Sequence, residues 1–208
     1  METIIYLIRH SEQLRVEEAN WTKDVDQIKN EKIILSVKGE KQSEALSKNK
    51  ELQNIDLVWS SNYVRAKETA KYIAQQNGQV MNISEDFNER KLGNIETLKK
   101  LGETKQYSYT TEQMLDENLK NRDGESRKEV HHRMKKAMEK LVNNNPGKRI
   151  AIVGHGAAMK YLLMEWCTLN QDKELTYHDQ VLSIDSPCII KMTFEDGQAK
   201  EIKQILTD

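Results

Sequence analysis

The stretch Ile4-Ile5-Tyr6-Leu7-Ile8-Arg9-His10 decides the fold class of this chain. Its first five residues form a continuous apolar run, which is typical of a strand buried on both faces of a parallel sheet. A second run, over residues 55–59, precedes Ser60-Ser61, and a third, over residues 150–153, precedes Gly154-His155-Gly156. A weaker run covers residues 80–83. These runs predict a mostly parallel sheet whose strands end in polar residues.

Segments with helical periodicity lie between the predicted strands. The clearest covers residues 126–142, where Ser126 and Glu129 form a capping box and the apolar residues fall on one stripe. Helices are also expected over residues 37–47, 64–74 and 157–166, and Asp196-Gly197 predicts a hairpin near the end of the chain. The alternation of strands and helices predicts an α/β fold with helices on both faces of the sheet.

The chain is expected to form a single domain over residues 1–208, because this length suits one α/β unit. Two polar segments, 13–35 and 92–123, do not fit the alternation. They are predicted to be long loops near the functional site, since loops of this length are more often functional than filler.

Composition excludes several classes of partner. The formal net charge is -1, so the chain has no global field that would attract nucleic acid or an anionic membrane. No apolar run approaches the roughly 20 residues that span a bilayer, and the N-terminus lacks the features of a signal peptide. Cys167 and Cys188 lie in apolar runs and are expected to be buried thiols. We therefore expect a soluble cytoplasmic protein; its oligomeric state stays open.

The candidate functional residues are those that directly follow the predicted strands. Ligands of open α/β sheets bind beyond the carboxyl ends of the strands, so these residues should converge on one edge. They are Arg9, His10, Arg65, Glu89 and His155.

This set of side chains suits phosphoryl transfer. Arginine forks match phosphate oxygens and stay charged, and an imidazole can be the nucleophile of a two-step displacement. A glutamic acid can protonate the leaving oxygen and later deprotonate the attacking water. Gly154 and Gly156 allow close backbone approach, and the helix that follows adds its positive end.

Six ordered motifs resemble those of the histidine phosphatase superfamily, also called the phosphoglycerate mutase-like family. They are Leu7-Ile8-Arg9-His10; Leu35-Ser36-Val37-Lys38-Gly39 with Gln42; Ser60-Ser61, Arg65-Ala66 and Thr69-Ala70; Glu89 with Gly93; Gly124-Glu125-Ser126 with Arg133; and Gly154-His155-Gly156. The Arg-His pair alone is weak evidence for the family, whereas six matches in the family's order form a specific signature.

The resemblance implies a three-layer α/β/α sandwich and a phosphatase that acts on a phosphate monoester. It implies that His10 is the nucleophile and forms a phosphohistidine, and that Glu89 is the proton donor. The phosphate-binding residues that it implies are Arg9, Arg65, His155 and Gly156. It further implies that no metal or cofactor is needed. The expected partner is a small phosphorylated substrate or a phosphoprotein.

Two other functions stay open. One is a phosphoglycerate mutase-type phosphotransferase, although the family's mutases usually carry an insertion that a chain of 208 residues has little room for. The other is a non-catalytic regulator that binds a phosphorylated ligand, although all five chemical residues are present. Ser11 stands where the family usually has glycine, and Gln13 where it usually has threonine. These departures affect the identity of the substrate, which the sequence does not predict.

Overall fold

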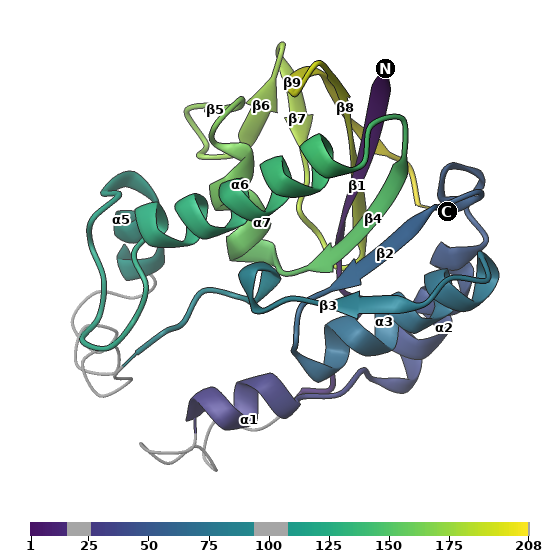
Figure 1. The fold of residues 1–208 in the computed structure, drawn as a ribbon. Helices are drawn as coiled ribbons and strands as arrows, with labels where there is room; N and C mark the ends of the chain where they lie inside the picture. Colours follow the sequence, from purple (N-terminus) through teal and green to yellow (C-terminus); the bar gives the residue numbers. More distant parts are fainter. Residues whose placement is uncertain (16–25, 94–107, 208) are drawn as a thin grey trace.

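A six-stranded sheet forms the centre of the protein in the computed structural model, which describes residues 1–15, 26–93 and 108–207 (Figure 1). The strands, in spatial order, are β3 (Met81–Ile83), β2 (Leu57–Ser60), β4 (Arg149–Gly154), β1 (Glu2–Arg9), β8 (Cys188–Glu195) and β9 (Gln198–Ile205). The first four are mutually parallel, whereas β8 and β9 are antiparallel to their neighbours. The predicted mostly parallel sheet is confirmed.

The three central parallel strands end level with one another. Arg9 at the end of β1 lies opposite Gly154 of β4, and Ser60 of β2 lies opposite Val153. Backbone hydrogen bonds continue one residue further, because His10 N donates to Gly154 O at 3.1 Å and Ser61 N donates to Val153 O at 3.0 Å. This register brings the polar residues after each strand to one edge of the sheet.

Helices cover both faces of the sheet and complete a three-layer sandwich (Figure 1). They are α2 (Val37–Ser47) and α3 (Val64–Gln76) on one face, and α6 (Arg127–Asn144) and α7 (Gly156–Leu163) on the other. Strand β1 serves both layers by alternation, since Ile5 and Leu7 pack with α6 and α7 while Tyr6 and Ile8 pack with α2 and α3. All four side chains are buried.

Local signals in the sequence place the helix ends and the last turn. The Ser126 hydroxyl accepts a hydrogen bond from Glu129 N at 3.3 Å, and the Glu129 carboxylate accepts one from Ser126 N at 2.8 Å, so the predicted capping box begins α6. Asp196 and Gly197 join β8 to β9 with φ of 50° and 77°, which confirms the predicted hairpin. Helix α7 ends at Leu163, three residues before the predicted end.

Three features differ from the predictions. A second, antiparallel sheet contains β5 (Thr168–Leu169), β6 (Leu175–Tyr177) and β7 (Gln180–Leu182). Strands of two or three residues are too short to show a period in the sequence. The segments 13–35 and 92–123, which were expected to be loops, contain α1 (Asp26–Lys32) and α5 (Ser108–Leu115); residues 16–25 and 94–107 lie outside the described part. Two short 3-10 helices, η2 (Lys50–Leu52) and η3 (Glu85–Phe87), complete the elements.

Both cysteines are free and buried, as predicted. Burial raises the pKa of each thiol to about 11, so both are protonated at neutral pH. Across the described residues, every helix is too short or too polar to cross a bilayer.

Gly39 allows α2 to lie against the backbone that follows His10. A Cβ at this position would lie 2.0 Å from the Glu12 carbonyl oxygen. That carbonyl accepts a hydrogen bond from Ser36 N at 3.0 Å, and Glu12 N donates to the Gln42 side chain at 3.0 Å. The backbone of Glu12 is therefore held on both sides and has little freedom to move away.

We expect Gly39→Ala to lower the free energy of unfolding by about 1–3 kcal/mol, the usual cost of overpacking. Helix propensity alone would give the opposite sign, a gain of about 1 kcal/mol. Urea unfolding of the parent and the variant measures the difference, with Lys41→Ala at an exposed position of the same helix as the control. A more stable Gly39→Ala protein would show that the two segments are not held in contact.

Candidate active site

His10 lies directly beyond β1 and is 5% exposed. Its Nδ1 lies 2.7 Å from the Ser11 carbonyl oxygen, and its Nε2 lies 3.1 Å from Arg65 Nε. A carbonyl only accepts and a guanidinium only donates, so Nδ1 must carry the proton and Nε2 the lone pair. The surroundings thus fix His10 as a neutral ring with its basic nitrogen facing a cation.

His155 lies beside His10, with ring centroids 5.2 Å apart. It is fully buried, and a hydrogen bond of 2.6 Å joins its Nε2 to the Ser61 hydroxyl. The Tyr63 ring packs against its other side at a centroid distance of 4.7 Å. The imidazole that follows β4 is therefore held by Ser61 and Tyr63, two residues of the segment between β2 and α3.

Two arginines place positive charge around the histidines. Arg65 extends from the first turn of α3, is 3% exposed, and also donates to the Asn30 carbonyl next to the end of α1. Arg9 donates to the Ile184 carbonyl, and its guanidinium packs against Gly156, where a Cβ would come within 3.0 Å of it. Gly156 is therefore the residue that lets α7 begin beside this arginine.

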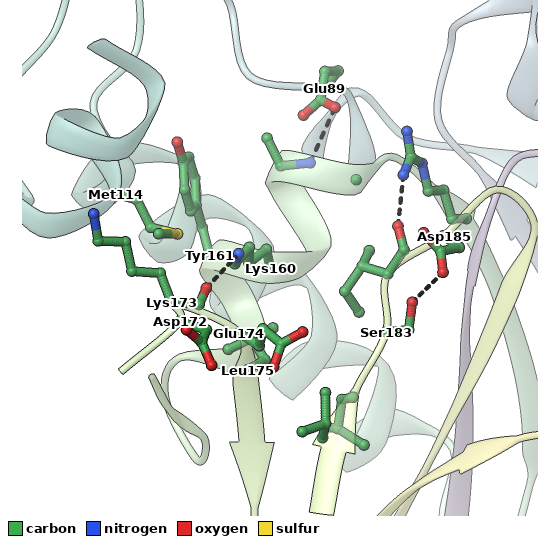
Figure 2. A pocket seen from close by; sticks show the side chains of 16 residues that line it. Glu89, Met114, Lys160, Tyr161, Asp172, Lys173, Glu174, Leu175, Ser183 and Asp185 are labelled. Atoms are coloured by element: carbon green, nitrogen blue, oxygen red, sulfur yellow. Dashed lines mark hydrogen bonds between the residues drawn. The ribbon is translucent and has the colours of Figure 1, made fainter. Parts of the chain in front are cut away.

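Glu89 lies in the segment after η3, and its carboxylate faces the start of α7. It accepts hydrogen bonds from Ala158 N at 3.0 Å and from Ala157 N at 3.2 Å. Figure 2 shows Glu89 beside a cavity. The first N–H groups of a helix have no partner within the helix and attract anions. Glu89 thus occupies an anion-binding position next to Gly156 and Arg9.

Arg133 of α6 holds the segment that carries Glu89. Its guanidinium binds both carboxylate oxygens of Glu125, at 2.7 and 2.9 Å, and donates to the carbonyls of Asp86 and Glu89, at 2.7 and 3.3 Å. A bidentate arginine pair of this kind is geometrically rigid. The position of Glu89 therefore depends on α6 as well as on its own segment.

Close contacts also join the two ends of the chain segment that leaves the site after Glu89. Glu125 N donates to the Lys91 carbonyl at 2.8 Å, and the Asn121 side chain donates to the Leu92 carbonyl at 2.8 Å. Gly93 has φ of +76° and lies so close to this backbone that a Cβ would be 2.4 Å from the Arg122 carbonyl oxygen. Residues 91–93 and 121–125 thus lie side by side, and we call this pair of segments the neck.

Three buried hydroxyl groups hold the backbone next to His10. The Thr69 hydroxyl accepts from Ser11 N at 3.1 Å, and the Ser43 hydroxyl donates to the Ser11 hydroxyl at 2.8 Å. All three residues are fully buried. The serine at position 11, where the related family usually has glycine, is thus accommodated by hydroxyl partners and leaves the carbonyl that orients His10 in place.

Burial and positive charge keep both histidines neutral. Desolvation, followed by the charges of Arg65 and Arg9, lowers the pKa of His10 to about 3. The same causes, together with His10 itself, lower the pKa of His155 well below its ordinary value. Arg9 Nε and His155 Nδ1 are buried without a hydrogen-bond partner in the described part of the chain. A phosphate oxygen accepts hydrogen bonds and could therefore serve as the missing partner of these nitrogens.

A cavity of about 560 Å³ opens beside Arg9 and Glu89, whereas His10, Arg65 and His155 do not line it (Figure 2). Arg9, Glu89 and Gly156 line it together with side chains of α5, α7 and the small sheet. The small sheet, which carries no catalytic motif, thus supplies part of the wall of the cavity. The volume falls in the usual range for pockets that bind small molecules.

The structure places all six residues that the sequence singles out, Arg9, His10, Arg65, Glu89, His155 and Gly156, at this edge of the sheet. Sequence reasoning did not assign Ser61, although the rule that polar residues after buried strands meet would have found it. The Ile184 carbonyl and Lys160, which also lines the cavity, have no comparable signal. Ile184 follows β7 of the small sheet, which the sequence did not reveal, whereas Lys160 lies on the predicted helix α7.

The low pKa of His10 predicts how stability depends on pH. An unfolded histidine gains its proton as the pH falls through about 6.5, whereas folded His10 stays neutral until about pH 3. The unfolded state then binds more protons, so stability present above pH 6.5 is lost on acidification, by up to about 1.4 kcal/mol per pH unit.

We therefore expect the free energy of unfolding to fall less steeply between pH 6 and pH 4.5 in His10→Gln than in the parent. Urea unfolding at several pH values measures both slopes, and the difference between them removes the contribution of carboxylates common to both proteins. Identical slopes would mean that His10 is protonated in the folded protein at these pH values.

Comparisons with known proteins show the family and the fold of this chain. The sequence model of the histidine phosphatase superfamily (branch 1) matches residues 5–204, whereas no curated protein matches the chain. A mycobacterial glucosyl-3-phosphoglycerate phosphatase is similar in structure, with 17% identity, a TM-score of 0.70 and coverage of 98% of this chain and 97% of the other.

Two further solved structures are similar over nearly their whole length. One is a putative alpha-ribazole-5'-P phosphatase from Escherichia coli, with 17% identity, a TM-score of 0.68 and coverage of 98% and 95% of the two chains. The other is a phosphoserine phosphatase from Entamoeba histolytica, with 20% identity, a TM-score of 0.64 and coverage of 96% of each chain. At these identities the structures establish a common fold, and the family match over residues 5–204 establishes that this chain belongs to the histidine phosphatase superfamily, branch 1.

Proposed function

We propose that this protein is a phosphatase that hydrolyses small phosphate monoesters through a phosphohistidine on His10. The observation that carries the proposal is the tautomer of His10, whose Nε2 lone pair faces Arg65 at 3.1 Å while Nδ1 is bound to Ser11 O. A neutral imidazole with a fixed ring is ready to attack phosphorus without first losing a proton.

In the first step, the hydrogen bond from Arg65 Nε to His10 Nε2 breaks, His10 Nε2 bonds to phosphorus, and the bond from phosphorus to the ester oxygen breaks. Arg9, Arg65 and His155 bind the transferring oxygens, and the backbone at Gly156 lies close to them. Charge on three oxygens is stabilised best by fixed donors in a buried site, and Arg65 and His155 are both nearly inaccessible to solvent.

Glu89 supplies the proton that the leaving oxygen needs. It lies at the start of α7 beside Gly156, and a glutamic acid within reach of the leaving oxygen can protonate it. In the second step, the Glu89 carboxylate takes a proton from water, whose oxygen bonds to phosphorus and releases His10. The two steps return both side chains to their starting states.

The proposed reaction uses no metal and no cofactor. Within the described ranges, His, Cys, Asp and Glu side chains form no group of three or more that could hold a metal ion. Independence of divalent metal stays a prediction, which activity in the presence of a chelator would check. A cytoplasmic location is likewise still a prediction from the sequence.

We expect His10→Ala to abolish hydrolysis of p-nitrophenyl phosphate, and we expect the parent protein, quenched during turnover, to carry phosphate that is stable to alkali and labile to acid. The variant cannot form the covalent intermediate, so it should carry none. His132→Ala, at an exposed position on α6, is the matched control. Activity of His10→Ala within tenfold of the parent would remove His10 from the mechanism.

Two alternatives predict other results, the first in this assay and the second in an assay with phosphoglycerates. A regulator without turnover would hydrolyse no ester, although it would bind phosphate. A mutase would convert one phosphoglycerate isomer into another faster than it releases phosphate.

We expect Glu89→Gln to slow hydrolysis of an alkyl phosphate by about 10²- to 10⁴-fold, the usual contribution of proton transfer, and to slow p-nitrophenyl phosphate much less. An alkoxide needs a proton to leave, whereas a nitrophenolate hardly does. Comparison of kcat/KM for the two esters measures the difference, with Glu85→Gln, exposed in η3, as the control. Equal losses on both esters would exclude Glu89 as the acid.

A further inference from the structure

We propose that Lys160 binds a second acidic group of the substrate, so that the preferred phosphate esters carry a carboxylate or another oxyanion on the leaving alcohol. This inference rests on the proposed phosphatase function, and it names the substrate class of that site. Neither the sequence motifs nor the comparisons assign Lys160 a role.

Lys160 lies one helical turn along α7 from Gly156, the residue that packs against the Arg9 guanidinium. Residues four apart share one face of a helix, and a rise of about 1.5 Å per residue puts their Cα atoms about 6 Å apart along the axis. Lys160 and Glu89 both line the cavity (Figure 2). Gly156 and Arg9 line it too, and Gly156 lies against the Arg9 guanidinium and next to Ala157, which donates to Glu89. Arg9, a proposed phosphate ligand, and Glu89, the proposed acid at the leaving oxygen, thus share this cavity with Lys160, so the leaving alcohol is expected to extend into it.

The ammonium of Lys160 has a neutral partner. Its Nζ donates to the Lys173 carbonyl oxygen at 3.1 Å, and the side chain is half-buried. In the described part of the chain, no carboxylate lies within ion-pair distance of it, and an ammonium has three donors. Burial lowers the pKa of Lys160, and the charge of Glu174 opposes this effect. A partly desolvated cation with spare donors gains free energy when an anion binds it.

The other charged residues of the cavity outside the catalytic group lie at its rim. Asp172, Lys173, Glu174 and Asp185 are all exposed. Glu174 accepts from the Asn170 side chain at 2.9 Å, and Asp185 accepts from the Ser183 hydroxyl. Apart from Arg9, Lys160 is thus the half-buried cation of the cavity wall. The exposed carboxylates at the rim lead to a competing prediction, because they would favour a cationic ligand.

Four ligands separate these possibilities: propyl phosphate, 3-phosphooxypropionate, 1,3-propanediol bisphosphate and 3-aminopropyl phosphate. They present a neutral, a carboxylate, a phosphate and an ammonium group at a similar distance from the ester phosphate. Titration calorimetry with the His10→Ala protein measures binding without turnover. We expect the carboxylate or the bisphosphate to bind about tenfold or more tightly than propyl phosphate, the gain of one charge-assisted hydrogen bond.

Adding Lys160→Gln to the His10→Ala protein should remove this preference, and adding Lys160→Met should do the same if the glutamine variant folds poorly. Adding Lys140→Gln, an exposed lysine of α6, should leave the preference intact. A preference that survives both Lys160 variants, or tighter binding of the ammonium ligand than of either anion, would overturn the inference. The parent's turnover of p-nitrophenyl phosphate is a separate readout, so failure of the phosphatase proposal is distinguishable from failure of this one.

Discussion

The hydrogen bonds from His10 N to the Gly154 carbonyl and from Ser61 N to the Val153 carbonyl extend the sheet one residue beyond β1 and β2. The rest of the site depends on this extension. It places His10 and His155 on adjacent strands with their rings 5.2 Å apart, and it puts the Ser61 hydroxyl within 2.6 Å of His155. A shift of one residue in either strand would turn these side chains toward opposite faces of the sheet. The register of the strands therefore determines whether the side chains of the candidate site meet.

The same edge of the sheet concentrates groups that oppose folding. Two arginines and two imidazoles share a buried volume, the pKa of both imidazoles is lowered, and two of the nitrogens lack a partner in the described residues. Such an arrangement costs free energy in the absence of an anion. The buried hydroxyls of Ser11, Ser43 and Thr69, and the clasp of Arg133 on Glu125, offset part of this cost with satisfied hydrogen bonds. Natural folds commonly concentrate unfavourable local choices at functional sites.

The sequence predicted the central layers and the polar residues after the strands, because strongly apolar runs and a capping box are local signals. It did not predict what surrounds them. The partner of Arg9 is the Ile184 carbonyl, which is 175 residues away in the chain, and β5 to β7 are too short to show a period. The helix α1, which supplies the Asn30 carbonyl to Arg65, is seven residues long and polar. Contacts of this kind depend on tertiary packing, which no window of sequence contains.

The neck, which includes Lys91, Gly93 and Glu125, separates a part of the chain that can change in length from a part that is held in place. Loops whose ends are pinned tolerate insertions well, because the entropy of closing a loop grows only slowly with its length. The chain between the pinned ends contributes Met114 to the wall of the cavity, while Glu89 is held on the other side of the neck by Arg133 and α7. Changes in the length of the chain between the pinned ends can therefore alter the wall that Met114 supplies while leaving Glu89 in place. This wall of the cavity is thus an exchangeable module, whereas Glu89, the proposed proton donor, is a fixed part of the scaffold.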